Sequence, residues 1–294
     1  YGHQFYWDRA AILMFQHATS GEMEKHVRPM ALGYFDEDDN LVPVARPREF
    51  FIVTEMAPGY DYYLDLARIQ KTGLESKDLA MAREFALWLA RVHSAKKDDA
   101  DLYLRRIRNL IGASECIFGL VDAYPHPYEL FPPERFCALE KRVVDWRWKL
   151  RSFTHRLSDV HGDFHPWNVL VQEDGEARDF AVLDRSRGQW GEPADDVATM
   201  SLNFVLFGLY GNARLGGDFE RLYKTFWETY LERTGDAEML AVIAPFYVFR
   251  GLVVASPQWY PGHPEAVRRG LLRFLENVLE DDRFDWANFN RYMD

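Results

Sequence analysis

The sequence has few of the features that mark secreted and membrane proteins. Cys116 and Cys137 are its two cysteines, too few for a disulfide framework and without metal-ligand spacing, which fits a reducing compartment. The longest apolar stretches, 202–210 and 241–256, are too short or are interrupted by Arg250, whereas a membrane-spanning helix needs about 20 apolar residues. We therefore expect a soluble, cytoplasmic protein with no membrane partner.

Basic runs and targeting segments are scarce too. No run of Lys and Arg with interleaved aromatic residues stands out, and the formal net charge of −11 repels a phosphate backbone on average. Nucleic acid is therefore not an expected partner. The chain starts at Tyr1 without an initiating Met, and its first residues show neither a signal nor a transit peptide.

Apolar residues are abundant: they make up 48% of 294 residues, which is enough for a globular chain with a substantial core. The amino-terminal part predicts a helix over 5–16 and strands over 27–35 and 49–55, with the acidic turn DEDDN between the strands. Pro58-Gly59 then breaks the pattern. We place a boundary there, which gives domains at 1–58 and 59–294.

The remaining chain is mostly helical by its periodicity. Helices are predicted over 75–95, 132–151, 194–210, 218–233, 236–255 and 264–280. Two short apolar runs interrupt them, at 168–172 and 179–184, and Asp174-Gly175 between the runs is a strong hairpin signal. The sequence therefore predicts one β-hairpin within a helical region.

This hairpin brings polar residues together. Asn168 opens its first strand, Asp184 closes its second, and Asp163 lies a few residues upstream on a loop. Two carboxylates a few ångströms apart repel by about 4 kcal/mol at an effective dielectric of 20, a cost that a divalent cation removes. Hard oxygen ligands suit Mg²⁺ better than Zn²⁺, and Mg²⁺ usually takes further ligands from phosphates. The pattern predicts a magnesium site that is completed by a nucleotide.

Two motifs carry a family resemblance. HGDFHPWN at 161–168 resembles the catalytic loop of the aminoglycoside phosphotransferase and choline kinase family, which shares its core with protein kinases, and VLDRSRGQWGEPADDVA at 182–198 resembles the metal-binding motif that follows. EFFIVTEMAPG at 49–59 is similar to the segment that links the two kinase lobes. LWLARVHSA at 87–95 is similar to the helix beneath the catalytic loop. The resemblance extends from about residue 5 to 280.

The resemblance implies an α+β, protein kinase-like two-lobe fold, with a truncated small β-containing lobe and a large, mainly helical lobe. It also implies an enzyme that moves the γ-phosphate of ATP, with Mg²⁺, to a hydroxyl group of a small molecule. The implied residues are Asp163 as catalytic base, Asn168 and Asp184 on the metal and nucleotide, the Glu55 carbonyl and Ala57 amide on adenine, His161 ordering the loop, and Asp196 capping the helix near Ala194 and bracing the loop.

One part of the family pattern is missing. The glycine-rich hairpin and the strand with a phosphate-binding lysine should precede the acidic residue for which Asp8 is the best candidate, yet no lysine stands before it. Either those strands lie upstream of Tyr1 in a longer chain, or the protein lacks them. The alternative function is a pseudokinase-like nucleotide-binding or scaffolding module. A protein kinase is less favoured, because no arginine follows His161.

Several residues near the motifs keep two interpretations. Trp167 and Trp190 either stack on a substrate or pack against the loop, and Arg185 and Arg187 either contact a phosphate or are solvated. The proline-rich loop 256–265 either shapes a substrate pocket or only connects two helices. Aminoglycosides, choline, homoserine, sugars and macrolides are all compatible acceptors, and the oligomeric state cannot be read from these features.

Overall fold

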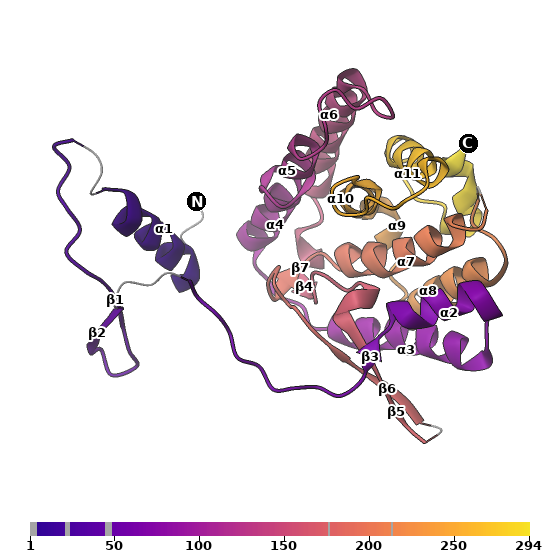
Figure 1. Ribbon diagram of the computed structural model, residues 1–294, viewed down its shortest axis with the longest axis horizontal. Coiled ribbons are helices and arrows are strands. Elements are labelled where there is room, and N and C mark those ends of the chain that lie inside the picture. Colours follow the sequence, from indigo (N-terminus) through magenta and orange to yellow (C-terminus); the bar gives the residue numbers. More distant parts are fainter. Residues whose placement is uncertain (1–4, 21–23, 45–48, 176, 213) are drawn as a thin grey trace. The chain divides into compact units, whose positions relative to one another are not determined.

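The chain forms two compact units, Tyr1–Met56 and Ala57–Asp294, which are drawn in Figure 1. This computed structural model describes residues 5–20, 24–44, 49–175, 177–212 and 214–294. The predicted domain 1–58 therefore lies partly outside the described residues. The boundary between the units falls two residues before the Pro58-Gly59 break.

The first unit contains one helix and one hairpin. Helix α1 (Tyr6–Thr19) confirms the helix predicted from the periodicity, and strands β1 (Leu32–Phe35) and β2 (Leu41–Val44) pair antiparallel. The acidic turn between them is held by Asp36, whose carboxylate accepts hydrogen bonds from the backbone N–H groups of Asp38 and Asn40. An aspartate at the start of a turn often bonds in this way, which explains why such an acidic stretch is compatible with a hairpin.

The strand predicted over 49–55 is wrong. These residues have no regular secondary structure, and Phe51, Ile52 and Val53 are 87%, 87% and 82% exposed. A strand requires a neighbour for its backbone hydrogen bonds, and no strand among the described residues pairs with this segment. The same reason shortens the strand predicted over 27–35, because only residues 32–35 face β2.

The second unit is built mainly from helices. They are α2 (Tyr63–Thr72), α3 (Ser76–Val92), α4 (Ala100–Gly112), α5 (Ile117–Asp122), α6 (Pro133–Leu150), α7 (Ala194–Leu209), α8 (Gly217–Thr234), α9 (Met239–Val242), α10 (Ala244–Ala255) and α11 (Glu265–Asn277), with short 3₁₀ helices at Thr154–Arg156, Pro166–Asn168 and Trp286–Met293. Three of them, α2, α4 and α5, lie outside the ranges that the periodicity predicts. The helix predicted over 236–255 is divided into α9 and α10, because Pro245 stands in the first turn of α10 and cannot continue a preceding helix.

Helices α7 and α10 form the centre of this unit. Both are buried on nearly every face, and a helix that is apolar all round must be covered on all sides. Helix α7 packs against α8 and α10, and α10 packs in turn against α11 and α5 (Figure 1). The two longest apolar runs of the sequence are thus core helices. No helix among the described residues is long and apolar enough to span a membrane.

The predicted hairpin is confirmed. Strands β5 (Val169–Asp174) and β6 (Ala177–Val182) pair antiparallel, with Val169 opposite Val182 and Asp174 opposite Ala177. Gly175 in the turn has a φ of +62°, a conformation that glycine adopts without cost, while Glu176 lies outside the described residues. Strand β3 (Tyr60–Asp61) extends this sheet on the other side of β5, and β4 (Ser158–Asp159) pairs with β7 (Trp190–Gly191).

Phe85 on α3 joins the hairpin to the helices. It is fully buried, and its ring lies edge-on to Tyr62, Phe164 and Phe180, at centroid distances of 4.7, 5.7 and 4.9 Å. Phe164 belongs to the HGDFHPWN motif and Phe180 to β6. This aromatic cluster therefore fixes the motif against both α3 and the hairpin.

We predict that Phe85→Ala lowers the free energy of unfolding by about 3–5 kcal/mol, because it removes a buried ring and leaves a cavity. Urea unfolding of the full chain measures this loss. The matched control is Glu84→Ala at the exposed neighbouring position on α3, which should stay within about 0.5 kcal/mol of the parent protein. Equal stabilities of the two variants would contradict the role assigned to the cluster.

Candidate active site

The HGDFHPWN motif forms a loop between β4 and β5 that ends in a 3₁₀ turn at Pro166–Asn168. Gly162 has a φ of +85°, and a Cβ atom at this position would lie 3.1 Å from the Cβ of Arg187. A larger residue would therefore face both backbone strain and a close contact. This glycine allows the loop to turn sharply next to the segment that follows β6.

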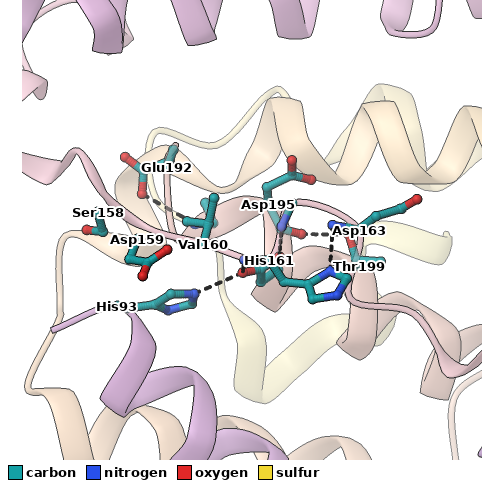
Figure 2. Close-up of polar contacts among 12 residues, drawn as sticks. His93, Ser158, Asp159, Val160, His161, Asp163, Glu192, Asp195 and Thr199 are labelled. Carbon is teal, nitrogen blue, oxygen red and sulfur yellow. Dashed lines mark hydrogen bonds and ion pairs between the residues drawn. The ribbon is translucent and has the colours of Figure 1, made fainter. Parts of the chain in front are cut away.

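Asp196 on α7 braces this loop. Its carboxylate accepts the backbone N–H of His161 at 2.8 Å and that of Gly162 at 2.7 Å. It also lies 3.1 Å from Nε2 of His93, which follows α3 and is labelled in Figure 2. Nδ1 of His93 lies 2.8 Å from the Tyr230 hydroxyl. Burial opposes ionisation of Asp196, but the contact with His93 outweighs it, so the pKa of the carboxyl lies below its ordinary value.

The expected helix cap is not made by Asp196. Pro193 occupies the N-cap position of α7 and makes no side-chain cap hydrogen bond. The Asp196 carboxylate is directed to the loop and not to the first amides of the helix. Glu192 contributes there instead, because its Oε1 accepts the backbone N–H of Ala194 at 3.3 Å. Glu192 is itself held by the buried guanidinium of Arg156 at 2.8 Å. An aspartate at the third helical position can therefore accept hydrogen bonds from a neighbouring loop and not from the first amides of its own helix.

His161 orders the loop from within. Its Nδ1 accepts the backbone N–H of Asp163 at 3.2 Å, and its ring lies against Phe164. Its Nε2 is buried and has no hydrogen-bond partner among the residues that the structure describes. The contacts are those of a residue that shapes the loop.

Asp163 is buried and lies between two arginines. Nη1 of Arg250 donates to its Oδ1 at 2.6 Å, and Nη2 of Arg187 lies 3.4 Å from its Oδ2. Burial raises the pKa of this carboxyl, but Arg250 and then Arg187 lower it by more, so the pKa lies below its ordinary value. The group is therefore ionised at neutral pH in spite of its burial.

Arg250 is the residue that the sequence analysis missed. The sequence shows it only as a charge that interrupts the apolar run 241–256. In the fold its guanidinium also donates to the Gly162 carbonyl at 2.7 Å and to the Asp195 carboxylate at 2.6 Å. A charged side chain within a core helix is rarely buried unless it is paired. The position of Arg250 inside an apolar run could therefore have indicated a buried acidic partner.

Asn168 and Asp184 meet at one end of the hairpin. Because the Leu183 N–H donates to the Asn168 carbonyl at 2.9 Å, Asp184 directly follows the residue that is paired with Asn168. The Asn168 side chain donates through Nδ2 to the Asp163 carbonyl at 3.1 Å, and no described residue donates a hydrogen bond to its Oδ1. Asp184 is exposed, has a φ of +56°, and makes no hydrogen bond or ion pair with any described residue.

These two side chains fit a magnesium ion. An amide oxygen and a carboxylate are hard ligands, and the unpaired, conformationally strained Asp184 has no other partner in the described part of the chain. No cluster of three or more His, Cys, Asp or Glu side chains that could hold a metal occurs within those same residues. A site with two protein ligands would depend on phosphate and water for its other ligands.

The expected adenine contacts lie in an extended linker. Glu55 is exposed and Ala57 is half-buried, and both lie within 49–58, which has no regular secondary structure. Glu55 belongs to the first unit and Ala57 to the second.

The aromatic residues near the loop contact one another. Trp167 stacks on Tyr63 at 5.3 Å, and the ring of Tyr260 lies 6.2 Å from it. Tyr260 is part of the loop 256–265, where it stacks on His263 at 4.7 Å. Trp190 lies under the ammonium group of Lys97, at 5.6 Å. Packing thus accounts for both tryptophans, and Trp167 additionally connects the catalytic loop to the loop 256–265.

Solved structures of small-molecule kinases share this fold. A glucosamine kinase in complex with glucosamine, ADP and inorganic phosphate has a TM-score of 0.51 at 18% identity, over 76% of this chain and 62% of that chain. A second structure, glucosamine kinase in crystal form B, has a TM-score of 0.50 at 16% identity, over 92% and 69%. An ethanolamine kinase from Plasmodium vivax matches with a TM-score of 0.40 at 14% identity, over 90% and 65%. The chain thus spans less than two thirds of the first of these proteins.

The fold is that of the protein kinase-like phosphotransferases, as the motifs indicate. A comparison with curated protein sequences gave no match. Residues 30–239, more than half of the chain, match the sequence profile of the phosphotransferase enzyme family. The protein belongs to this family.

We predict that Asp196→Asn lowers the free energy of unfolding by about 1–3 kcal/mol at pH 7. The carboxylate has two acceptor oxygens for the His161 and Gly162 amides and the His93 ring, whereas the amide of asparagine has one. The pKa of Asp196 is lowered in the fold, so the carboxylate stabilises the protein above the ordinary aspartate pKa of about 3.9. This contribution is lost as the pH falls through the lower folded pKa. Urea unfolding should therefore show that the difference between parent and variant narrows below about pH 4.

The control for this substitution is Asp145→Asn on α6, where the carboxylate is exposed and has no ion-pair partner among the described residues. It should change the free energy of unfolding by no more than about 0.5 kcal/mol at either pH. A difference between parent and Asp196→Asn that stays constant from pH 7 to 3 would contradict the assignment of an ionised Asp196.

Proposed function

We propose that the protein is an ATP-dependent kinase that transfers the γ-phosphate to a hydroxyl group of a small molecule. The observation that carries this proposal is the arrangement of Asp163, Asn168 and Asp184. Asp163 is ionised and held on the loop. Asn168 donates a hydrogen bond to the loop backbone. Asp184 follows the adjoining strand and has no partner among the described residues. Phosphoryl transfer requires mainly positioning and neutralisation of charge, which these three groups suit.

Asp163 would orient the acceptor. Its lowered pKa makes it a weak proton acceptor in the ground state, so its main contribution would be to align the acceptor hydroxyl with the γ-phosphate. The proton would move to the carboxylate only as the hydroxyl oxygen begins to bond to phosphorus, when the acidity of that hydroxyl rises. The acceptor would approach through Oδ2, because Arg250 occupies Oδ1 with the shorter contact.

Asn168 and Asp184 would hold the magnesium ion, which would neutralise charge on the phosphates when it is bound. Arg187 is the second group suited to phosphate. Its Nε and Nη1 are buried and have no hydrogen-bond partner among the described residues, which is unusual for donors of a charged group. Arg185 differs, since it donates to the Val160 carbonyl and pairs with Asp159. Of the two arginines in this segment, Arg187 is thus the one with buried donors that lack a partner in the described part of the chain.

The remaining roles follow from family membership. The Glu55 carbonyl and the Ala57 amide would contact adenine, which requires ordering of the linker 49–58 around the nucleotide. The acceptor would lie near Trp167 and Tyr260, where the catalytic loop meets the loop 256–265. Because glucosamine kinases share the fold, a screen of hydroxyl compounds for ATP consumption should start with amino sugars and continue with choline, homoserine, aminoglycosides and macrolides.

The second candidate is a nucleotide-binding module that transfers no phosphate. It is favoured by the arginines beside Asp163, which engage both oxygens of the proposed base. It predicts stabilisation by MgATP without consumption of ATP in the presence of any acceptor. The two substitutions below distinguish this module from an enzyme.

We predict that Asp163→Asn reduces kcat by about 10²- to 10⁴-fold, because the amide can neither orient the hydroxyl as a charged acceptor nor take up its proton. Binding of MgATP, measured by calorimetry, should be retained, since the family places Asp163 on the acceptor side. The control is Asp179→Asn on β6, where the carboxylate is exposed and bonds only to the neighbouring Phe180 amide. Phosphate transfer by Asp163→Asn at the parental rate would refute the assignment.

We predict that Asp184→Asn weakens MgATP binding at least about 100-fold, because the charged metal ligand is lost while asparagine still tolerates the positive φ. At a nucleotide concentration of 100 times the parental Kd, the stabilisation should fall from about 2.7 to about 0.4 kcal/mol. Thermal unfolding with and without MgATP measures it, and Asp179→Asn is again the control. Unchanged stabilisation of Asp184→Asn by MgATP would be incompatible with a metal site at Asp184.

A further inference from the structure

Arg250 is a buried charge of the second unit that is engaged through every nitrogen atom of its guanidinium. Its side chain is 6% exposed, and Nε, Nη1 and Nη2 all donate hydrogen bonds. The acceptors are Oδ1 of Asp163, the carbonyl of Gly162 and Oδ1 of Asp195. The guanidinium also lies over the Phe249 ring, with 4.4 Å between its central carbon and the ring centroid. Planar stacking and a full set of hydrogen bonds leave the group little freedom to move.

The two arginines beside Asp163 differ in how many of their nitrogen atoms already donate hydrogen bonds. Arg187 reaches Asp163 through a long contact of 3.4 Å and keeps two nitrogen atoms without hydrogen-bond partners among the described residues. Arg250 makes a contact of 2.6 Å and uses every nitrogen atom. Binding a phosphate with Arg250 would require breaking bonds to buried carboxylates, which is costly. Arg250 is therefore suited to hold a protein group and not a ligand.

The contacts of Arg250 connect three parts of the chain. Asp163 and Gly162 belong to the catalytic loop, Asp195 belongs to the first turn of α7, and Arg250 itself belongs to α10. Burial raises the pKa of Asp195 above its ordinary value, and Arg250 opposes this shift without cancelling it, so the arginine stabilises the charge of two carboxylates. Of the charges that face Asp163, Arg250 has the largest effect, followed by Arg187 and His165.

We infer that Arg250 is a positioning residue for the phosphotransfer proposed above: its guanidinium fixes the rotamer of Asp163 and compensates the buried charge of its carboxylate. The inference rests on the proposed function for its effect on rate, but its effect on Asp163 is independent of that function. Without the guanidinium, the carboxylate would lose its shortest ion pair and could rotate about the Cα–Cβ bond. Arg250 would act through Asp163 and would not touch the reacting atoms.

The test compares kcat, KM and the Kd for MgATP in the parent protein and in Arg250→Met. In the variant kcat should be lower by about 10²-fold, because the carboxylate of Asp163 is no longer held in one orientation. The KM for the acceptor and the Kd for MgATP should change little, since Arg250 makes its contacts with protein groups. An unchanged kcat for folded Arg250→Met would overturn the inference.

Two further variants separate positioning from packing. Arg250→Lys keeps a charge near Asp163 and should recover part of the lost kcat, although a single ammonium group cannot reach all three acceptors. Asp195→Asn removes the other carboxylate that Arg250 holds but leaves the contact with Asp163, so its kcat should stay close to that of the parent. A loss of kcat in Asp195→Asn as large as that in Arg250→Met would overturn the inference.

A measurement without turnover covers the case in which no acceptor is phosphorylated. Urea unfolding of Arg250→Met, Asp163→Asn and the double variant forms a double-mutant cycle. If Arg250 compensates Asp163, the double variant should be less destabilised than the sum of the two single variants, because Asp163→Asn removes the buried charge that Arg250→Met leaves unpaired. Additive effects would overturn the inference whatever the enzyme does. Failure of the proposed function alone would leave the non-additivity intact.

Discussion

The site depends on one buried carboxylate. Asp196 is fully buried, and it accepts the backbone N–H groups of His161 and Gly162, which are consecutive residues of a loop that has no regular hydrogen-bond ladder of its own. Two amides directed at one carboxylate define the plane and the direction of the chain just before Asp163. Because His93 links the same carboxylate to Tyr230 on α8, the geometry of the loop is tied to the helical core.

A second set of charges holds the carboxylate of Asp163, the group proposed to orient the acceptor. Asp163, which is buried, and Asp195, which is half-buried, approach the same arginine from different elements. Arg250 compensates both, while Asp184 is exposed and lacks a partner in the described part of the chain. The difference agrees with the roles proposed for these residues: a carboxylate that would orient a neutral hydroxyl can be compensated by the protein, whereas a metal ligand would need to keep its charge for the ion. The core helices α7 and α10 make this possible, because the surrounding apolar side chains keep water from competing for the pairs.

Local patterns in the sequence predicted the local parts of this structure. The hairpin, the five-residue step from Asp163 to Asn168 and the helix after Gly191 depend on neighbours in the sequence, and they lie where the pattern places them, apart from one or two residues at the ends. The strand over 49–55 failed for the opposite reason, since a strand is stable only with a partner and its own residues do not encode one. The roles of Arg250 and His93 were not predicted for a similar reason. Their partners, Asp163 and Asp196, lie 87 and 103 residues away in the sequence.

The proposed acceptor position and the proposed phosphate and metal site are built differently. The groups proposed to orient phosphate and metal come from one continuous stretch, 161–184, whose geometry is set by a loop and a hairpin. The groups near the proposed acceptor position come from separate elements, because Trp167 meets Tyr63 at the start of α2 and Tyr260 after α10. Each of these rings is already packed against another ring, so an acceptor would have to fit beside an existing aromatic cluster rather than between free side chains. Selectivity would therefore depend on the length and position of the loop 256–265, which can vary without disturbing the contacts of Arg250, more than one helical turn earlier on α10.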